Sequence, residues 1–169
     1  MRRRSSAHPE PVTPGPGQES VWDYPRPPRL EASDRHVVVR LAGTVVADTR
    51  RALRVLETSH PPSWYLPPGD CDMTLFSAAP GSSFCEWKGL ASYWTVTVPG
   101  ETAERMAWSY PEPSERFAEL RDHIALYPPT FDCTVDGEVV RPQPGTFYGG
   151  WVTNDVVGPF KGEPGTMWW

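Results

Sequence analysis

Proline is the residue that most constrains the fold of this chain, because 21 prolines are spread over its 169 residues and several of them stand in pairs. A proline removes one backbone N–H donor and disfavours helix in the residue before it. The segments that remain between prolines and glycines are short, and many are rich in β-branched and aromatic residues. Such punctuation predicts many short strands with little helix.

Three predicted hairpins follow from this pattern, each with a short turn between two strand-like segments. They comprise residues 36–41 and 44–47 around Ala42–Gly43, residues 91–98 and 104–110 around Pro99–Gly100, and residues 131–135 and 138–140 around Asp136–Gly137. A further short strand is predicted at residues 64–66. We therefore expect a mainly β (α+β) fold.

Other segments are less regular. The apolar spacing of residues 50–57 is compatible with a helix or a strand. Residues 78–83 are predicted to form a loop, and Ser114 is predicted to cap a short helix whose apolar positions include Phe117 and Leu120.

The composition changes twice along the chain, which predicts one domain with two extensions. Residues 1–20 contain few large apolar side chains and are expected to be flexible. Residues 21–141 are predicted to form a single β-rich domain that begins with an extended arm at 21–28. Residues 142–169 are expected to wrap around that domain, and Lys161 is assigned to this wrapping tail rather than to phosphate binding.

Charge and cysteine content restrict the class of partner. The net charge is −5 and the sole basic cluster is Arg2–Arg4, which argues against binding of duplex nucleic acid. A small neutral or cationic ligand fits this charge better. No apolar run approaches the roughly 20 residues that span a bilayer, so no membrane association is predicted. The three cysteines form no Cys-x-x-Cys pair, which favours reduced thiols and a cytoplasmic protein.

Four polar residues are candidates for chemistry. Cys85 lies three residues before Lys88, whose ammonium would favour a nucleophilic thiolate or bind an anionic group. Glu57 lies three residues before His60 and could orient the imidazole as a base. The alternatives are a buried cysteine in a turn and a polar pair that closes a proline-rich loop.

The aromatic content suggests a binding site, since Trp and Tyr need polar partners when buried. The predicted ligand-binding residues are Tyr65, Trp87, Lys88, Tyr93, Trp108 and Tyr110. Successive residues of a strand face opposite sides, so Trp64 and Tyr65 cannot line one pocket, nor can Tyr93 and Trp94. An aromatic cage would suit a flat ring or a cation, and the alternative is an aromatic core.

Three stretches together resemble the family known as domain of unknown function 427, which carries a nucleotidyltransferase-like label. They are residues 57–67 (Glu-Thr-Ser-His-Pro-Pro-Ser-Trp-Tyr-Leu-Pro), Cys85–Gly89 with Tyr93–Trp94, and residues 107–111 (Ala-Trp-Ser-Tyr-Pro). The resemblance covers roughly residues 35–135, and Glu86 stands where family members commonly have proline.

The resemblance implies a β-tent fold, in which two antiparallel sheets meet at an angle around a pocket, with one or two short helices. Many proteins of this fold hold zinc with two Cys-x-x-Cys pairs. This sequence contains no such pair, so neither a metal site nor a cofactor is predicted.

The nucleotidyltransferase label directs attention to Asp70 and Asp72, because nucleotidyl transfer uses paired carboxylates to hold divalent metals. The Gly81–Ser82 pair follows these residues, whereas in nucleotidyltransferases a Gly-Ser turn precedes the Asp-x-Asp pair. The alternative is a capped helical turn whose carboxylates face water.

Three functional hypotheses result. The first is a module that binds a small planar or cationic ligand, or a modified residue, in an aromatic-lined pocket between two sheets. The second is an enzyme that uses Cys85, Lys88, Glu57 and His60 in the same pocket, or metal-dependent nucleotidyl transfer. The third is an interaction protein that docks a partner through its proline-rich N-terminus. The oligomeric state is left open.

Overall fold

The computed structural model describes residues 8–169, in which the chain forms strands and 3-10 turns and no α-helix. The 3-10 turns are η1 (Val21–Asp23), η2 (Pro68–Asp70), η3 (Met73–Leu75) and η4 (Glu115–Leu120). None of these has the length and apolar character that crossing a membrane would require, and no other helix is present in the described residues. The prediction of a mainly β fold is confirmed.

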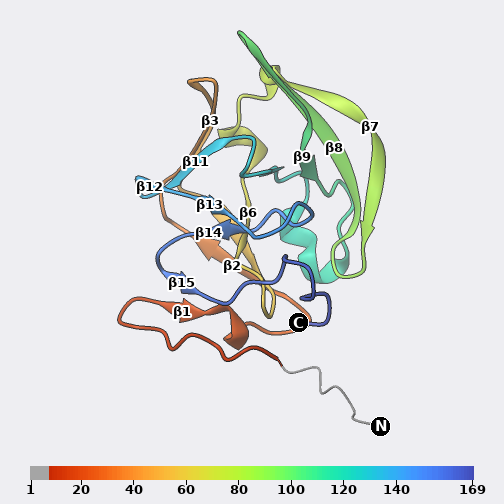
Figure 1. Cartoon of the computed structure of the whole chain (residues 1–169). Coiled ribbons are helices and arrows are strands. Elements are labelled where there is room, and N and C mark those ends of the chain that lie inside the picture. The colour runs from red at the N-terminus through yellow and green to blue at the C-terminus, as the bar shows by residue number, and fades with distance from the viewer. Residues whose placement is uncertain (1–7) are drawn as a thin grey trace.

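Two four-stranded antiparallel sheets form the two sides of the domain (Figure 1). The first has the order β10 (Ala125–Leu126), β9 (Glu101–Ser109), β8 (Gly89–Val98) and β7 (Phe76–Cys85). The second has the order β12 (Glu138–Val139), β11 (Asp132–Val135), β3 (Val37–Leu41) and β4 (Thr44–Thr49). In Figure 1 the first sheet lies on the right, and β3 and β11 of the second lie on the left.

A third antiparallel sheet, which the sequence did not predict, contains β2 (Arg29–Ser33), β5 (Ala52–Leu56) and β6 (Ser63–Tyr65) in that order. All five residues of its middle strand β5 are buried. This strand settles the ambiguity of residues 50–57. Apolar side chains on both faces obscure any two-residue periodicity, because a strand covered on both sides has no polar face.

The three sheets enclose two apolar clusters on opposite faces of the β5–β6 pair. Trp64 belongs to the first cluster, where it stacks on Trp151 with ring centres 5.8 Å apart. Tyr65, its neighbour in β6, belongs to the second cluster with Leu53 and Phe117. Strand alternation therefore separates the two aromatic residues, as predicted.

Two of the predicted hairpin turns have positive φ at both central residues, a conformation that glycine and aspartate tolerate and that Ala42 adopts against its preference. Ala42 and Gly43 have φ of 46° and 80°, and Asp136 and Gly137 have φ of 49° and 80°. Two successive residues with positive φ match the right-handed twist of the strands on either side, which is why Asp-Gly favours such turns. The turns join β3 to β4 and β11 to β12.

Two local predictions are wrong. Residues 78–83 belong to β7, where pairing with β8 supplies the backbone hydrogen bonds, and an irregularity between Ala79 and Ser82 accommodates Pro80 and Gly81. The helix expected after Ser114 is the 3-10 turn η4, with non-helical torsion angles at Phe117. Beyond it, Ile124 forms an isolated bridge with Leu66 rather than another helical turn.

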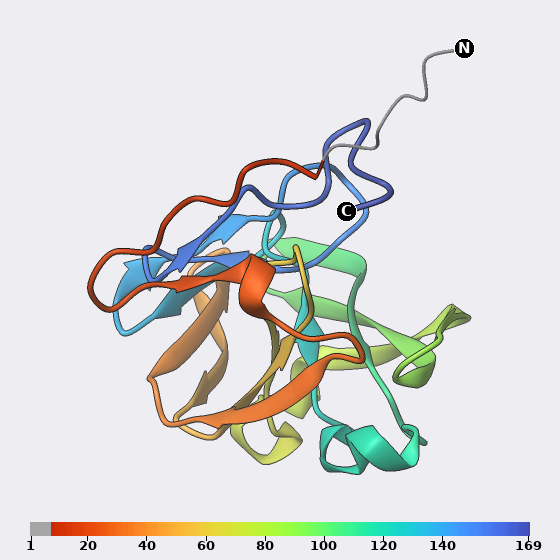
Figure 2. The same ribbon diagram turned by 90° about the horizontal axis from the view of Figure 1, so that it is seen from below.

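The two ends of the described chain run side by side along one face of the domain (Figure 2). Strand β1 (Glu19–Ser20) pairs in parallel with β15 (Val156–Val157), and the amide of Val12 donates to the carbonyl of Gly158 at 2.8 Å. Strands β13 (Arg141–Pro142) and β14 (Trp151–Val152) pair with each other. The predicted flexible segment includes residues 1–7, which lie outside the described residues.

Candidate functional site

The β7–β8 hairpin carries the candidate residues Cys85 and Lys88. Cys85 pairs with Gly89, so residues 86–88 form the loop between the strands. Gly89 has a φ of 105°, a conformation that other residues rarely adopt. The Ser114 amide donates to the Lys88 carbonyl at 3.0 Å, and the Ser114 hydroxyl donates to the Trp87 carbonyl at 2.6 Å. These two hydrogen bonds tie the loop to the start of η4.

The Lys88 ammonium lies over two buried tyrosine rings. It is 5.7 Å from the centre of the Tyr65 ring and 5.5 Å from the centre of the Tyr110 ring. The two ring centres are 6.2 Å apart. Each ring presents its negative face to a cation, so the chain's own lysine occupies a small aromatic cage.

The charge of Lys88 is only partly compensated. No carboxylate of residues 8–169 lies within 4.0 Å of its ammonium. Burial disfavours the charged form, but the electrostatic influence of Tyr65, Cys85 and Glu57 outweighs burial and raises the pKa of Lys88. Burial also raises the pKa of Tyr110, which is therefore a neutral phenol. The lysine is thus a half-buried cation over the Tyr65 and Tyr110 rings.

Most of the predicted ligand-binding residues gather around this lysine. Tyr65 and Tyr110 are buried members of the second apolar cluster, and the half-buried Trp87 and Trp108 pack against it. Tyr93 lies at the edge of this group, because its hydroxyl is 2.7 Å from the Ser83 hydroxyl and its ring lies under the Arg105 guanidinium. Trp94 faces the first cluster instead, as strand alternation predicts.

Glu57 and His60 do meet, with 3.5 Å between a carboxylate oxygen and Nε2 of the imidazole. The side-chain amide of Gln143 donates to Nδ1 of His60 at 3.1 Å, so the proton of the neutral ring is on Nε2 and faces Glu57. Burial, followed by the positive charges of Lys161, Arg26 and Lys88, lowers the pKa of His60 to about 3. The carboxylate alone would favour the imidazolium, but these effects outweigh it, and the contact joins a neutral imidazole to a carboxylate.

The sequence did not predict that the arm and the tail contribute to this site. Arg26 of the arm donates to Glu57 at 3.3 Å and to the carbonyl of Thr58 at 2.9 Å. The Tyr148 ring of the tail lies 4.8 Å from the His60 ring, and the Lys161 ammonium lies 5.7 Å from the Tyr148 ring centre. The sequence contained one indication that the tail contributes, because Lys88 and Lys161 are the only lysines in the sequence.

Asp70 and Asp72 make local structural contacts. The Asp70 carboxylate accepts hydrogen bonds from Thr49 at 2.7 Å and from Arg51 at 3.0 and 3.2 Å. Asp72 caps η3 by accepting from the amide of Thr74. Within residues 8–169, no three His, Cys, Asp or Glu side chains are grouped so that they could hold a metal ion.

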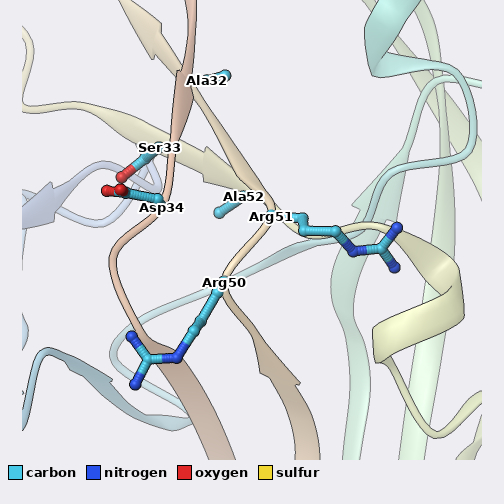
Figure 3. Close-up of a pocket in the computed structure, with 6 residues that line it drawn as sticks. All are labelled: Ala32, Ser33, Asp34, Arg50, Arg51 and Ala52. Atoms are coloured by element: carbon cyan, nitrogen blue, oxygen red, sulfur yellow. The ribbon is translucent and has the colours of Figure 1, made fainter.

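Two open depressions lie on the surface, and Lys88 lines neither of them. Figure 3 shows the first, lined by Ala32, Ser33, Asp34, Arg50, Arg51 and Ala52. The two arginine side chains point in different directions there, and Arg51 is the one that binds Asp70. The second is lined by residues 102–106 together with Tyr93 and Thr130.

Comparison with known proteins places most of the chain in one family. Residues 29–140 match the family described as a domain of unknown function, DUF427. No curated protein matches the chain. The matched region contains Glu57, His60, Tyr65, Lys88 and Tyr110, whereas Arg26, Gln143, Tyr148 and Lys161 lie outside it.

Proposed function

This chain belongs to the DUF427 family, and for this member we propose a binding function: the site around Lys88 takes a small planar ligand that carries negative charge. The observation that supports the proposal is the Lys88 ammonium, which lies over Tyr65 and Tyr110 with no carboxylate partner among the described residues. The family description leaves the function of its members open.

The negative charge follows from the cost of burying a cation. A charged group removed from water needs a partner of opposite charge. Two tyrosine faces supply only about 0.5–2 kcal/mol each, which is less than a close counter-ion would. An anionic group on a ligand would complete the site, and Lys88 would repel a cationic ligand. We therefore favour a planar anion over the cationic ligand that an empty aromatic cage would suit.

The planar shape follows from the aromatic surroundings. Trp87 and Trp108 are half-buried and pack against the apolar cluster that contains the two tyrosines. Flat rings stack on such surfaces or meet their edges, with a gain of about 0.5–1.5 kcal/mol per pair. The same site could recognise an aromatic anion free in solution or one attached to another protein.

An enzyme that uses Cys85 as a nucleophile is the second candidate. Cys85 is half-buried and lies in the same hairpin as Lys88, three residues before it. His60 is not placed to act as its base, because Nδ1 of the imidazole accepts from Gln143 and its Nε2 carries the proton. Metal-dependent nucleotidyl transfer receives no support from Asp70, whose carboxylate binds Thr49 and Arg51.

A cytoplasmic location remains part of the proposal. All three cysteines are free thiols in the folded chain, and two of them, Cys71 and Cys133, are buried. Free thiols suit a reducing compartment. We make no proposal about the oligomeric state or about a protein partner.

The test compares anions that carry a flat ring with neutral molecules that carry the same ring. Benzoate is paired with benzamide, and phenyl phosphate with phenol, at constant ionic strength, and the melting temperature is measured. A ligand that binds only the folded state raises the melting temperature. We expect each anion to raise it more than its neutral partner does, and Lys88→Met to abolish the difference while keeping the apolar stem.

The matched control is Arg40→Met, which removes one positive charge from the exposed side of β3 and should leave the response unchanged. The proposal is wrong if neutral molecules act as well as anions, or if Lys88→Met retains the preference for anions.

A further inference from the structure

Arg105 has an unusual backbone conformation in the middle of β9. Its φ of 58° lies in the left-handed region, which residues other than glycine, asparagine and aspartate rarely adopt. At this point residues 104–106 of β9 stand opposite the single residue Thr95 of β8. The Arg105 amide donates to the Thr95 hydroxyl at 3.2 Å. Bulges and backbone outliers of this kind are frequent at binding sites, because they redirect a side chain out of the regular alternation of a strand.

The Arg105 guanidinium reaches across the two neighbouring strands. Strands β9, β8 and β7 are consecutive in the first sheet (Figure 1). Cζ of Arg105 lies 4.8 Å from the centre of the Tyr93 ring in β8. Gly81 in β7 leaves room for the guanidinium, because a Cβ atom there would lie 2.9 Å from Nη2, and this glycine belongs to the irregular part of β7 between Ala79 and Ser82. Irregularities in two strands and a ring in the strand between them therefore position one arginine.

The positive charge of Arg105 is not paired with a carboxylate. Within residues 8–169, no Asp or Glu oxygen lies within 4.0 Å of its guanidinium. The Tyr93 ring attracts the charge, but a guanidinium also has five N–H donors in a rigid planar fork. The side chain is exposed, so these donors are open to an acceptor that arrives from solution.

The same arginine lines one of the two open depressions. This depression is formed by residues 102–106 together with Tyr93 and Thr130. Met106 is half-buried and gives the depression an apolar part, whereas Glu104 is exposed and adds one negative charge. The depression thus combines one positioned cation, one apolar side chain and one carboxylate that is not paired with that cation.

We propose that this depression is a second anion site, separate from Lys88, which binds the carboxylate of a small aliphatic acid. A guanidinium pairs with a planar carboxylate through two parallel N–H···O hydrogen bonds. One negative charge matches Arg105, whereas a doubly charged phosphate would bring its second charge toward Glu104. The short apolar chain of the acid would lie against Met106, where burial of apolar surface favours binding.

NMR spectroscopy of the full chain tests the proposal with propionate as the probe. Amide proton–nitrogen correlation spectra are recorded at about pH 8 as propionate replaces chloride at constant ionic strength. We expect propionate to shift the signals of Gly81, residues 102–106 and Thr130 along one saturable curve. Propionamide, the neutral molecule of similar size, and inorganic phosphate should each bind at least about ten-fold more weakly, because neither forms the same bidentate pair with a single matching charge.

The variants separate the planar fork from positive charge in general. Arg105→Lys keeps the charge and loses the fork, so it should weaken propionate binding about ten-fold. Arg105→Met should abolish the saturable shifts. Gly81→Ala keeps the arginine but places a Cβ atom 2.9 Å from Nη2, so it should also lower the affinity. Arg40→Met, the charge control on the exposed side of β3, should leave the affinity within about two-fold. Unchanged signals elsewhere in each spectrum show that the fold is intact.

Two results would overturn the proposal on the ligand side. The first is the absence of saturable shifts with up to about 100 mM propionate. The second is propionamide or inorganic phosphate that binds as tightly as propionate. Retention of wild-type affinity in Arg105→Met would likewise show that the arginine does not bind the acid.

Lys88→Met distinguishes this site from the proposed function. It should leave propionate binding within about two-fold, because Lys88 does not line the depression. Benzoate also carries a carboxylate, so its melting-temperature test is repeated in Arg105→Met, which lacks the second site. If propionate shifts signals around Lys88 rather than Arg105, the second site is wrong and the proposed function stands. If propionate binds at Arg105 while the benzoate response in Arg105→Met does not depend on Lys88, the second site stands and the proposed function is wrong.

Discussion

Gln143 and His60, which are 83 residues apart in the sequence, share a hydrogen bond of 3.1 Å between the side-chain amide and Nδ1 of the imidazole. Gln143 is buried, and its side-chain oxygen accepts from the amide of Gly150 at 3.1 Å. The orientation of the glutamine therefore determines the tautomer of the histidine. Through this bond the tail holds His60 in a neutral form next to Glu57.

The first prediction concerns the pH dependence of stability. The pKa of His60 is about 3 in the folded chain, against 6.5 for an unperturbed histidine. Between these values the unfolded chain binds a proton that the folded chain does not, so the free energy of unfolding should decrease as pH falls from about 6.5 to about 3. The loss attributable to His60 should be about 5 kcal/mol at most, because one pKa unit corresponds to about 1.4 kcal/mol.

Urea unfolding between pH 7 and pH 4 measures this effect. His60→Gln should flatten the pH dependence, because it removes the group whose protonation differs between the two states. The control His123→Gln removes an imidazole outside this cluster and should retain the wild-type slope. An unchanged slope in His60→Gln would contradict the assignment.

A second prediction tests how closely the tail packs on the domain. A Cβ atom at Gly149 would lie 2.5 Å from Cη2 of the Trp108 ring, which is too close for carbon atoms. Gly149→Ala should therefore displace the tail or the ring and destabilise the fold by about 1–3 kcal/mol. Thermal unfolding with circular dichroism measures the change.

Gly69→Ala is the matched control, because its new Cβ would have ordinary contact with Arg51 at 3.8 Å. A Gly149→Ala variant as stable as Gly69→Ala would show that the tail does not rest on Trp108.

A third prediction concerns Arg54, a charged residue buried in the middle of β5. Its guanidinium donates to Glu31 at 2.6 Å and to Glu19 at 2.8 Å, and 5% of its side chain is exposed. Arg54→Met should destabilise the protein by about 3 kcal/mol, because it separates two carboxylates from their shared partner. Arg40→Met, on the exposed side of β3, should change stability by no more than about 0.5 kcal/mol.

Urea unfolding of both variants at high and low salt gives the comparison. The difference between them should persist at high salt, since buried charges are screened less than exposed ones. A loss of stability that disappears at high salt would mean that the ion pairs of Arg54 are accessible to solvent.

The fourth prediction ranks the three thiols. Burial, followed by the nearby Asp70, raises the pKa of Cys71 to about 12, and burial likewise raises the pKa of Cys133. Cys85 is half-buried at the end of β7. Iodoacetamide at about pH 8 should therefore alkylate Cys85 at least about ten-fold faster than the other two.

Peptide mass spectrometry resolves the three sites over time. In urea all three should react at similar rates, which controls for sequence effects on labelling. Equal rates in the folded protein would mean that the two buried cysteines are exposed by opening of the fold.

Local rules accounted for much of the architecture. The Asp136–Gly137 turn formed where aspartate and glycine tolerate positive φ, and the Ala42–Gly43 turn formed around its glycine. Strand alternation separated Trp64 from Tyr65 because neighbouring residues of a strand must face opposite sides. Local rules failed at residues 78–83, where Pro80 and Gly81 indicated a loop but pairing with β8 made a strand. Pairing depends on the partner strand, here the next strand along the chain, and the propensity of residues 78–83 alone contains no information about that partner.

The sequence by itself determined the mainly β class, the main turns and the residues on each face of a strand, because those properties depend on neighbours along the chain. Only the tertiary structure decided that Lys88 lies over Tyr65 and Tyr110 and that Lys161 lies over Tyr148. These contacts join segments far apart in the sequence, and their formation depends on how the sheets and the tail pack. The tertiary structure also decided the protonation state of His60, because the pKa of the imidazole depends on burial and on charges from the arm, the hairpin and the tail.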